Sequence, residues 1–264
     1  KEYENKLFSS YELIGDSKNI SSIRDQIEKI SITESRIIIT GPSGSGKELI
    51  ARKIHKRSKR NGKPFVILNG ALLDKNKYEL ELFGEEKPDG TISYGSLENA
   101  NKGTLLIDHI SEIPLEIQSK ILRVLIDQKF KRINGSSDIK VDVRLICSSN
   151  KDLKNEILLG NFREDLFHRI SVFEIYIDSL NNRISDIPLL IKYFSEKISK
   201  NYNIKNLEID ENDSYILNHN WKGNVRELRN LIERIAILQP ENKDKISSII
   251  KESLKNDNFQ DKIT

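Results

Sequence analysis

The stretch GPSGSGKE, from Gly41 to Glu48, restricts the fold of this chain more than any other feature. The β-branched run SRIIIT precedes it, and the helical pattern KELIARKIHKRS begins at its last two residues. The pattern G-x-x-x-x-G-K between a strand and a helix predicts a phosphate-binding loop, because glycines let successive backbone N–H groups approach phosphate oxygens. We therefore expect an α/β domain built around a loop that binds the phosphates of a nucleotide.

The parts of this loop have different expected roles. Lys47 is expected to reach the β- and γ-phosphates, and the N-terminus of the following helix favours negative charge. Glu48 stands where the pattern usually has Ser or Thr, so one magnesium ligand is missing. The residues that we expect to contact the nucleotide here are Gly41, Pro42, Ser43, Gly44, Ser45, Gly46, Lys47, Glu48 and Leu49.

Strand and helix patterns alternate along the first part of the chain, which predicts a parallel sheet covered by helices. After about residue 184 only helical patterns remain, for example NVRELRNLIERIAIL. We expect an α/β domain over 1–183, a small all-helical domain over 184–240, and a linker or helix over 241–264. The five predicted strands lie within 35–40, 63–70, 103–110, 141–150 and 172–177.

The third predicted strand, GTLLIDHI, ends in Asp108. An aspartate at the end of a buried strand beside a phosphate loop is placed to hold magnesium, directly or through water. It could instead only start a turn. Because the phosphate loop is present, we favour the magnesium role.

Composition excludes several classes of function. Lys and Arg number 43 against 40 Asp and Glu, so the net charge of +3 does not indicate a nucleic-acid reader. The single cysteine, Cys147, rules out an internal disulfide and lies in a predicted strand core, and the four histidines stand too far apart in sequence for a metal site. No apolar run is long enough to span a membrane, and we expect a cytoplasmic protein. Because no methionine occurs, even at position 1, we expect a piece of a longer chain.

Several motifs occur in an order that resembles a known family. Besides the phosphate loop and GTLLID, they include ELFGEEK, VDVRLICSSNKDL, NFREDLFHRI and WKGNVRELRNLIER. From about Glu12 to Leu238 the chain resembles the central AAA+ domain of sigma-54-dependent, NtrC-like response regulators. The resemblance implies a P-loop NTPase with a five-stranded parallel sheet between helices, a helical lid, and ATP or ADP with Mg²⁺ as cofactors.

The resemblance also implies roles around the nucleotide. Ile14 and Gly15 lie where the family frames the adenine. Asn69 corresponds to an asparagine that holds the catalytic glutamate in an idle position. Ser149 and Asn150 match the polar sensor near the γ-phosphate.

Three arginines match family positions that act on the phosphates. Arg163 and Arg169 correspond to the arginines that reach into the site of a neighbouring subunit, and Arg226 corresponds to the second sensor on the lid. Without the resemblance, the acidic residues near these arginines favour a simpler interpretation, in which the arginines form surface ion pairs. The carboxylates available for such pairs are Glu164 and Asp165 for the first two, and Glu227 and Glu233 for Arg226.

His109 departs from the family pattern, in which a glutamate follows the aspartate and activates the attacking water. A carboxylate only accepts hydrogen bonds, whereas an imidazole beside a triphosphate favours its protonated form, which cannot act as a base. A positioned general base is worth about 10²- to 10⁴-fold. We therefore expect ATP binding with slow hydrolysis at a site that contains Asp108, His109, Asn150, Arg163 and Arg169. The alternative is that neutral His109 or a rearranged water sustains modest turnover.

The segment after ELFGEEK is the second departure. The family continues with a Gly-Ala-Phe-Thr-Gly-Ala loop that touches the sigma factor, but this chain continues with PDGTISYGSLENA. The NtrX-like branch of the family also lacks that loop, and this segment is similar to that branch. We expect no remodelling of the sigma-54 polymerase.

The resulting prediction is an ATP-binding AAA+ domain of an NtrX-like regulator that self-associates into a dimer or ring. The resemblance implies a receiver domain that meets a sensor histidine kinase, and a helix-turn-helix domain through which alone DNA is bound. Two alternatives stay open. One is an active ATPase that remodels the sigma-54 polymerase, and the other is a dimerisation scaffold without nucleotide.

Overall fold

The computed structural model describes residues 12–73, 77–205, 207–240 and 242–256. The charged N-terminal segment and the end of the expected tail, residues 257–264, lie outside the described residues. The described chain forms two compact units.

The first unit contains residues 23–41 and 47–177, and the second contains 12–22, 42–46 and 178–256. The tip of the predicted phosphate loop is thus grouped with the helical part of the chain. Each unit is described separately below.

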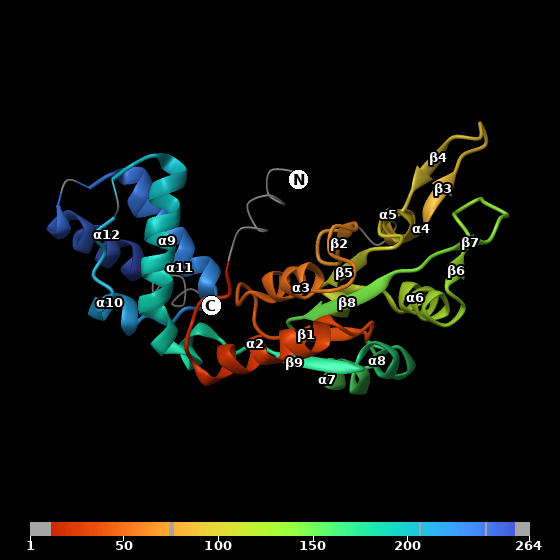
Figure 1. The fold of residues 1–264 in the computed structure, drawn as a ribbon, viewed down its shortest axis with the longest axis horizontal. Coiled ribbons are helices and arrows are strands. Elements are labelled where there is room, and N and C mark those ends of the chain that lie inside the picture. Colours follow the sequence, from red (N-terminus) through yellow and green to blue (C-terminus); the bar gives the residue numbers. More distant parts are fainter. Residues whose placement is uncertain (1–11, 74–76, 206, 241, 257–264) are drawn as a thin grey trace. The chain divides into compact units, whose positions relative to one another are not determined.

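A five-stranded sheet forms the centre of the first unit, in the order β2-β5-β8-β1-β9 (Figure 1). All four strand pairs are parallel. The three isoleucines of β1 are buried, as expected for an inner strand that packs on both faces. The predicted five-stranded parallel sheet is therefore confirmed. Its strands are β1 (Ile37–Thr40), β2 (Phe65–Asn69), β5 (Thr104–Asp108), β8 (Arg144–Ser149) and β9 (Phe173–Tyr176).

The long helices follow the apolar spacing read from the sequence. In α2 (Lys18–Ser31) the isoleucines Ile20, Ile23, Ile27 and Ile30 are all buried. Helix α3 (Lys47–Lys56) packs on β1, β5 and β8, and α6 (Leu115–Asp127) packs on α8. Five shorter helices lack a readable period: α4 (Tyr78–Phe83), α5 (Ser96–Asn99), η1 (Ile110–Glu112), α7 (Leu153–Leu158) and α8 (Glu164–Ile170).

Two hairpins project side by side from the first unit (Figure 1). They consist of β3 (Gly84–Glu86) with β4 (Ile92–Tyr94), and β6 (Lys129–Phe130) with β7 (Ile139–Lys140). The first hairpin occupies the segment where the family has its sigma-contacting loop. Here a five-residue turn closes it, with the Lys87 N–H donating to the Thr91 carbonyl at 2.9 Å.

The second unit is all-helical, as the sequence predicts. Trp221 is buried and its Nε1–H donates to the Ile216 carbonyl at 3.0 Å, which makes it a packing anchor. Within the expected linker or helix, α12 packs on α10 and α11 and buries Ile246, Ile250 and Leu254. The elements are η2 (Leu180–Asn182), η3 (Ile184–Asp186), α9 (Ile187–Tyr202), α10 (Ser214–Leu217), α11 (Asn224–Leu238) and α12 (Lys243–Asn256). Across the described ranges, no helix combines the length and apolar character that crossing a bilayer requires.

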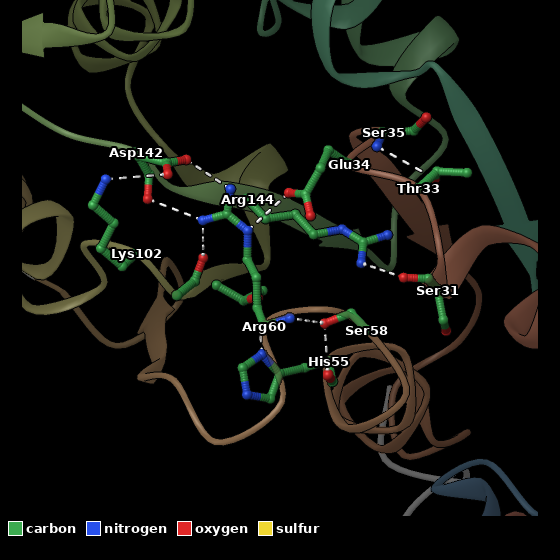
Figure 2. A network of polar contacts seen from close by, with 12 residues as sticks. Ser31, Thr33, Glu34, Ser35, His55, Ser58, Arg60, Lys102, Asp142 and Arg144 are labelled. Atoms are coloured by element: carbon green, nitrogen blue, oxygen red, sulfur yellow. Dashed lines mark hydrogen bonds and ion pairs between the residues drawn. The ribbon is translucent and has the colours of Figure 1, made fainter.

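A polar network ties together the amino-terminal end of the sheet (Figure 2). The Arg60 guanidinium pairs with Glu34 at 2.8 Å and with Asp142 at 2.6 Å, and it also donates to the Gly103 carbonyl at 2.9 Å. Arg144, the first residue of β8, donates to the carbonyl of Ile30 at 2.8 Å. The network joins the ends of α2, α3, β5 and β8.

We expect Arg60→Met to lower the free energy of unfolding by about 1–2 kcal/mol, because several hydrogen bonds to charged and backbone acceptors are lost together. The matched control is Arg57→Met, which removes an exposed ion pair with Glu28 and is expected to cost less than about 0.5 kcal/mol. Urea unfolding at unchanged m-value measures both. Equal losses for the two variants would contradict a structural role of the network.

Candidate functional site

The loop after β1 has the backbone form that its glycines predict. Gly41 has φ +147°, and a Cβ there would lie 2.4 Å from the Ile177 carbonyl oxygen. Gly44 has φ +74°, and a Cβ there would lie 2.2 Å from the Gly223 carbonyl oxygen. Both positions therefore require glycine, for backbone conformation and for space.

Lys47 is the first residue of α3 and is buried. Its Nζ donates to the Gly41 carbonyl at 2.8 Å, so the ammonium group spans the loop from end to start. The Gly41 N–H donates to the Ser149 carbonyl at 3.2 Å, which fixes the start of the loop to the end of β8. The Lys47 ammonium group and the N-terminus of α3 thus lie together at this loop, and both favour a bound anion.

Asp108 closes β5, and its carboxylate Oδ1 accepts a hydrogen bond from the Ser148 hydroxyl. Ser148 is fully buried on the neighbouring strand β8. Ser148 is part of the SSN run that closes this strand, but no motif in the sequence distinguishes it from its neighbours. Its hydroxyl orients the Asp108 carboxylate through Oδ1.

His109 has a left-handed backbone, with φ 57° and ψ 49°. Such a conformation is uncommon outside glycine and often marks a functional position. Its Nδ1 lies 3.3 Å from the Asn150 Oδ1, and its Nε2 lies 3.8 Å from the Asp108 Oδ2. The structure therefore brings Asp108, His109 and Asn150 together at the carboxyl edge of the sheet.

Asn69 and Glu48 both have local partners. Asn69 lies beside Asp108 in the sheet, but its Oδ1 accepts from the Ala71 N–H at 2.9 Å. Glu48 pairs with Arg52 at 2.8 Å, one turn further along α3. The Glu48 carboxylate thus neutralises an arginine of its own helix.

The two arginines of the NFREDLFHRI motif lie at the two ends of α8. Arg163 pairs with Asp165 at 2.6 Å, and this hydrogen bond raises the pKa of Arg163. The Arg169 guanidinium donates to the Leu125 carbonyl at 3.2 Å. Arg163 thus forms the surface ion pair that its neighbours in the sequence favour.

In the second unit, α11 begins against the tip of the phosphate loop. The Arg226 Nη1 donates to the Ser43 hydroxyl at 3.3 Å, and its backbone N–H donates to the Gly44 carbonyl at 3.2 Å. The carboxylates suggested as ion-pair partners of Arg226 have other partners. Glu227 contacts His219 at 2.8 Å, and Glu233 pairs with Arg229 at 3.6 Å.

Asp186 holds the segment around Gly15. It is fully buried, and its Oδ1 accepts from the backbone N–H groups of Asp16 and Ser17, each at 2.8 Å. A Cβ on Gly15 would lie 2.5 Å from the Asp186 Cγ. Ile14 precedes this glycine and is partly buried. The role of Asp186 is not visible in the sequence, since nothing in its local pattern separates it from an ordinary residue at the start of a helix.

A parallel sheet with a phosphate loop after β1 and an acidic residue closing β5 defines a P-loop NTPase fold, here followed by a helical lid of the AAA+ type. Residues 13–176 match the sigma-54 interaction domain family, and residues 181–263 match the AAA+ ATPase lid domain. The chain belongs to the family of sigma-54 interaction domains.

Known relatives and structures agree with this assignment. The chain is 43% identical over 235 residues to the nitrogen assimilation regulatory protein NtrX of Azorhizobium caulinodans, covering 88% of this chain and 52% of that protein. The structure is similar to the crystal structure of NtrX from Brucella abortus in complex with ADP, with a TM-score of 0.85 and 40% identity over 94% of this chain and 58% of that chain. The ATP complex of the same protein gives a TM-score of 0.83 and 42% identity over 92% of this chain and 57% of that chain. The chain spans about half the length of the curated relatives it matches.

We expect Gly44→Ala to destabilise the protein by about 2 kcal/mol more than Gly62→Ala. Both glycines have φ near +75°, but a Cβ on Gly62 meets nothing within 4 Å, whereas one on Gly44 meets backbone. The Gly62 variant isolates the backbone cost of about 1 kcal/mol. Thermal or urea unfolding of both variants measures the difference, and equal stability would show that the loop does not pack as described.

Proposed function

We propose that this chain is the ATP-binding regulatory domain of an NtrX-like two-component transcription regulator, with weak ATP hydrolysis. The observation that carries the proposal is the glycine loop between β1 and α3, with Lys47 at its end. The ADP and ATP complexes of the Brucella abortus protein support nucleotide binding by the same family.

The proposed nucleotide contacts follow from the chemistry of each group. Backbone N–H groups of the loop and the Lys47 ammonium suit the phosphates, and Arg226 hydrogen-bonds the loop through Ser43. Ile14 and Gly15 are proposed to contact the adenine.

Mg²⁺ fits the residues present. Within the described residues, no cluster of three or more His, Cys, Asp and Glu side chains forms a metal cage. Magnesium beside a nucleotide usually takes only one or two carboxylates together with waters and phosphate oxygens, and Asp108 supplies one carboxylate that Ser148 orients. Bound Mg²⁺ would neutralise charge on the phosphates.

Slow hydrolysis is proposed because His109 replaces the water-activating glutamate of the family. Both of its ring nitrogens face side-chain oxygens, those of Asn150 and Asp108. The 3.3 Å contact gives Nδ1 a side-chain partner, whereas the 3.8 Å distance from Nε2 to Asp108 is longer than a hydrogen bond. The acidic residue next along the chain, Glu112, pairs with Lys151 at 3.0 Å.

We further propose that this domain does not remodel the sigma-54 polymerase. The short turn of the β3–β4 hairpin and the absence of the Phe-Thr sequence support this. Membership in the sigma-54 interaction domain family favours the second candidate, an active sigma-54 remodelling ATPase. Stimulated ATP turnover in the presence of sigma-54 polymerase would support that candidate and overturn the proposal.

Partners are proposed from the relatives. Two of them are the nitrogen assimilation regulatory protein NtrX and the DNA-binding transcriptional regulator NtrC, and each is about twice as long as the matched region. We propose that a receiver domain and a DNA-binding domain complete the natural protein, and that a sensor histidine kinase acts on the receiver. Nucleotide binding would then tune self-association through Arg163 and Arg169.

We expect the protein to bind ATP and ADP with Mg²⁺ but to release phosphate slowly, and His109→Glu to raise turnover by about tenfold or more. Calorimetry and steady-state phosphate release on the same samples measure both. Lack of ATP binding would remove the proposed function. Fast turnover by the unchanged protein, or no gain in the His109→Glu protein that still binds ATP, would contradict the role given to His109.

We expect Arg169→Ala to weaken ATP-dependent self-association by about tenfold, because a desolvated arginine at a phosphate contributes strongly. Arg57→Ala, at an exposed ion pair, is the control and should leave self-association unchanged. Analytical ultracentrifugation with and without ATP measures the effect. Equal association of the two variants would argue against an arginine that acts between subunits.

A further inference from the structure

Three consecutive carbonyl groups at the tip of the phosphate loop accept hydrogen bonds from residues far along the chain. Asn224 Nδ2 donates to the Ser43 carbonyl at 2.9 Å. The Arg226 backbone N–H donates to the Gly44 carbonyl at 3.2 Å. Arg183 Nη2 donates to the Ser45 carbonyl at 3.0 Å. All of these residues belong to the second unit.

The direction of a carbonyl fixes the direction of the next N–H. A trans peptide is planar, with its C=O and N–H pointing to opposite sides, and the described chain has no cis peptide bond. Donors held at the Ser43 and Ser45 carbonyls therefore turn the N–H groups of Gly44 and Gly46 away from the lid residues. These are the groups that a phosphate loop presents to its anion.

Arg183 is buried and has several polar contacts that fix the position of its guanidinium. Its side chain is only 2% exposed and lies 3.5 Å from the fully buried Asp186 carboxylate. Its Nε also donates to the Asp178 carbonyl at 3.3 Å. The guanidinium is thus held from two further sides while it contacts the Ser45 carbonyl.

Asn224 is also held from two sides. Its backbone is left-handed, at φ 54°, and its Oδ1 accepts from the Leu180 N–H at 2.7 Å while its Nδ2 donates to the loop. Helix α11, which begins at Asn224, has no side-chain cap at Gly223, and the Gly44 carbonyl accepts one of the N–H groups of its first turn. Loop and helix start therefore satisfy each other's backbone groups.

We propose that Arg183 and Asn224 are positioning residues that orient the peptide groups of the phosphate loop from outside, and so set its affinity for nucleotide phosphates. This inference rests on the proposed nucleotide binding. Neither side chain needs to touch the nucleotide. A buried guanidinium is costly to desolvate unless its hydrogen bonds are kept, so Arg183 holds the Ser45 carbonyl in one direction.

The test compares Arg183→Met, Arg183→Lys and Asn224→Asp with Arg144→Met. Asn224→Asp keeps the oxygen that accepts from Leu180 and removes the Nδ2 group, which donates to the Ser43 carbonyl and, at 3.3 Å, to the Lys222 carbonyl. Arg144→Met is the matched control, because Arg144 is also a buried arginine on backbone carbonyls, but it begins β8 at the end opposite Ser149. Two quantities are measured: the Kd for ATP and ADP, and the amide hydrogen exchange of residues 43–47 without nucleotide.

We expect Arg183→Met and Asn224→Asp to raise the Kd for ATP by about tenfold or more and to speed exchange in the loop by a similar factor. Exchange in α9 and the middle of α11 should stay unchanged, and Arg183→Lys should lie between the unchanged protein and Arg183→Met. Arg144→Met should lower thermal stability and leave the Kd within about twofold.

Folded variants with an unchanged Kd and unchanged loop exchange would overturn the proposal. So would faster exchange spread evenly over the second unit, because that result indicates general loosening. If Arg183→Met does not fold, Asn224→Asp and Arg183→Lys decide. If the unchanged protein binds no ATP, the proposed function fails, and loop exchange alone decides whether these residues position the loop.

Discussion

Parallel pairing of β5, β8 and β1 is the constraint on which the candidate site depends. Because the strands are parallel, their carboxyl ends lie at one edge, where ligands of open α/β sheets bind. Asp108 ends β5, Ser149 ends β8, and Gly41 follows β1 with its N–H bonded to the Ser149 carbonyl. One pairing scheme thus assembles residues that stand more than a hundred positions apart in the sequence.

The sequence predicts those parts of the fold that have long or strong local patterns. The five strands are short apolar runs bounded by turn residues, and α2, α3, α6, α9 and α11 have clear helical spacing. The five shorter helices of the first unit and the two hairpins are too short to give a period, and their positions depend on contacts with neighbouring elements. For example, β3 and β6–β7 meet at the bridge between Glu85 and Ile133, which no local pattern encodes.

The candidate site likewise contains residues that sequence motifs predict and residues that they do not. Lys47 and Asp108 follow from motifs, whereas Ser148, Arg183 and Asp186 emerge only from the structure. Arg183 contacts the backbone carbonyl of a residue 138 positions away. Because every residue has the same carbonyl group, the identity of the residues does not predict this contact. The role of His109 stands between these cases. Its identity is visible in the sequence, but its left-handed backbone and its contact with Asn150 are not.

Under the proposed function, nucleotide binding and hydrolysis depend on different kinds of groups. Phosphate binding depends mainly on backbone N–H groups and one lysine, so it tolerates changes elsewhere in the site. Water activation depends on one side chain, and the residue after Asp108 has changed from glutamate to His109. His109 lies beside Asp108 and Asn150, so the identity of this residue also affects the surroundings of both.

Two buried arginines show what such groups can contribute. Burial lowers the pKa of both Arg144 and Arg183, which is the signature of a desolvated cation. Arg144 donates to the last carbonyls of α2, which lack partners within the helix, and so it links the end of α2 to the start of β8. Arg183 instead donates to a carbonyl of the phosphate loop, where the same chemistry sets the direction of an N–H group. Identical side chains thus serve stability at one end of the sheet and orientation of a binding loop in the helical unit, and the carbonyl groups that accept from them differ accordingly.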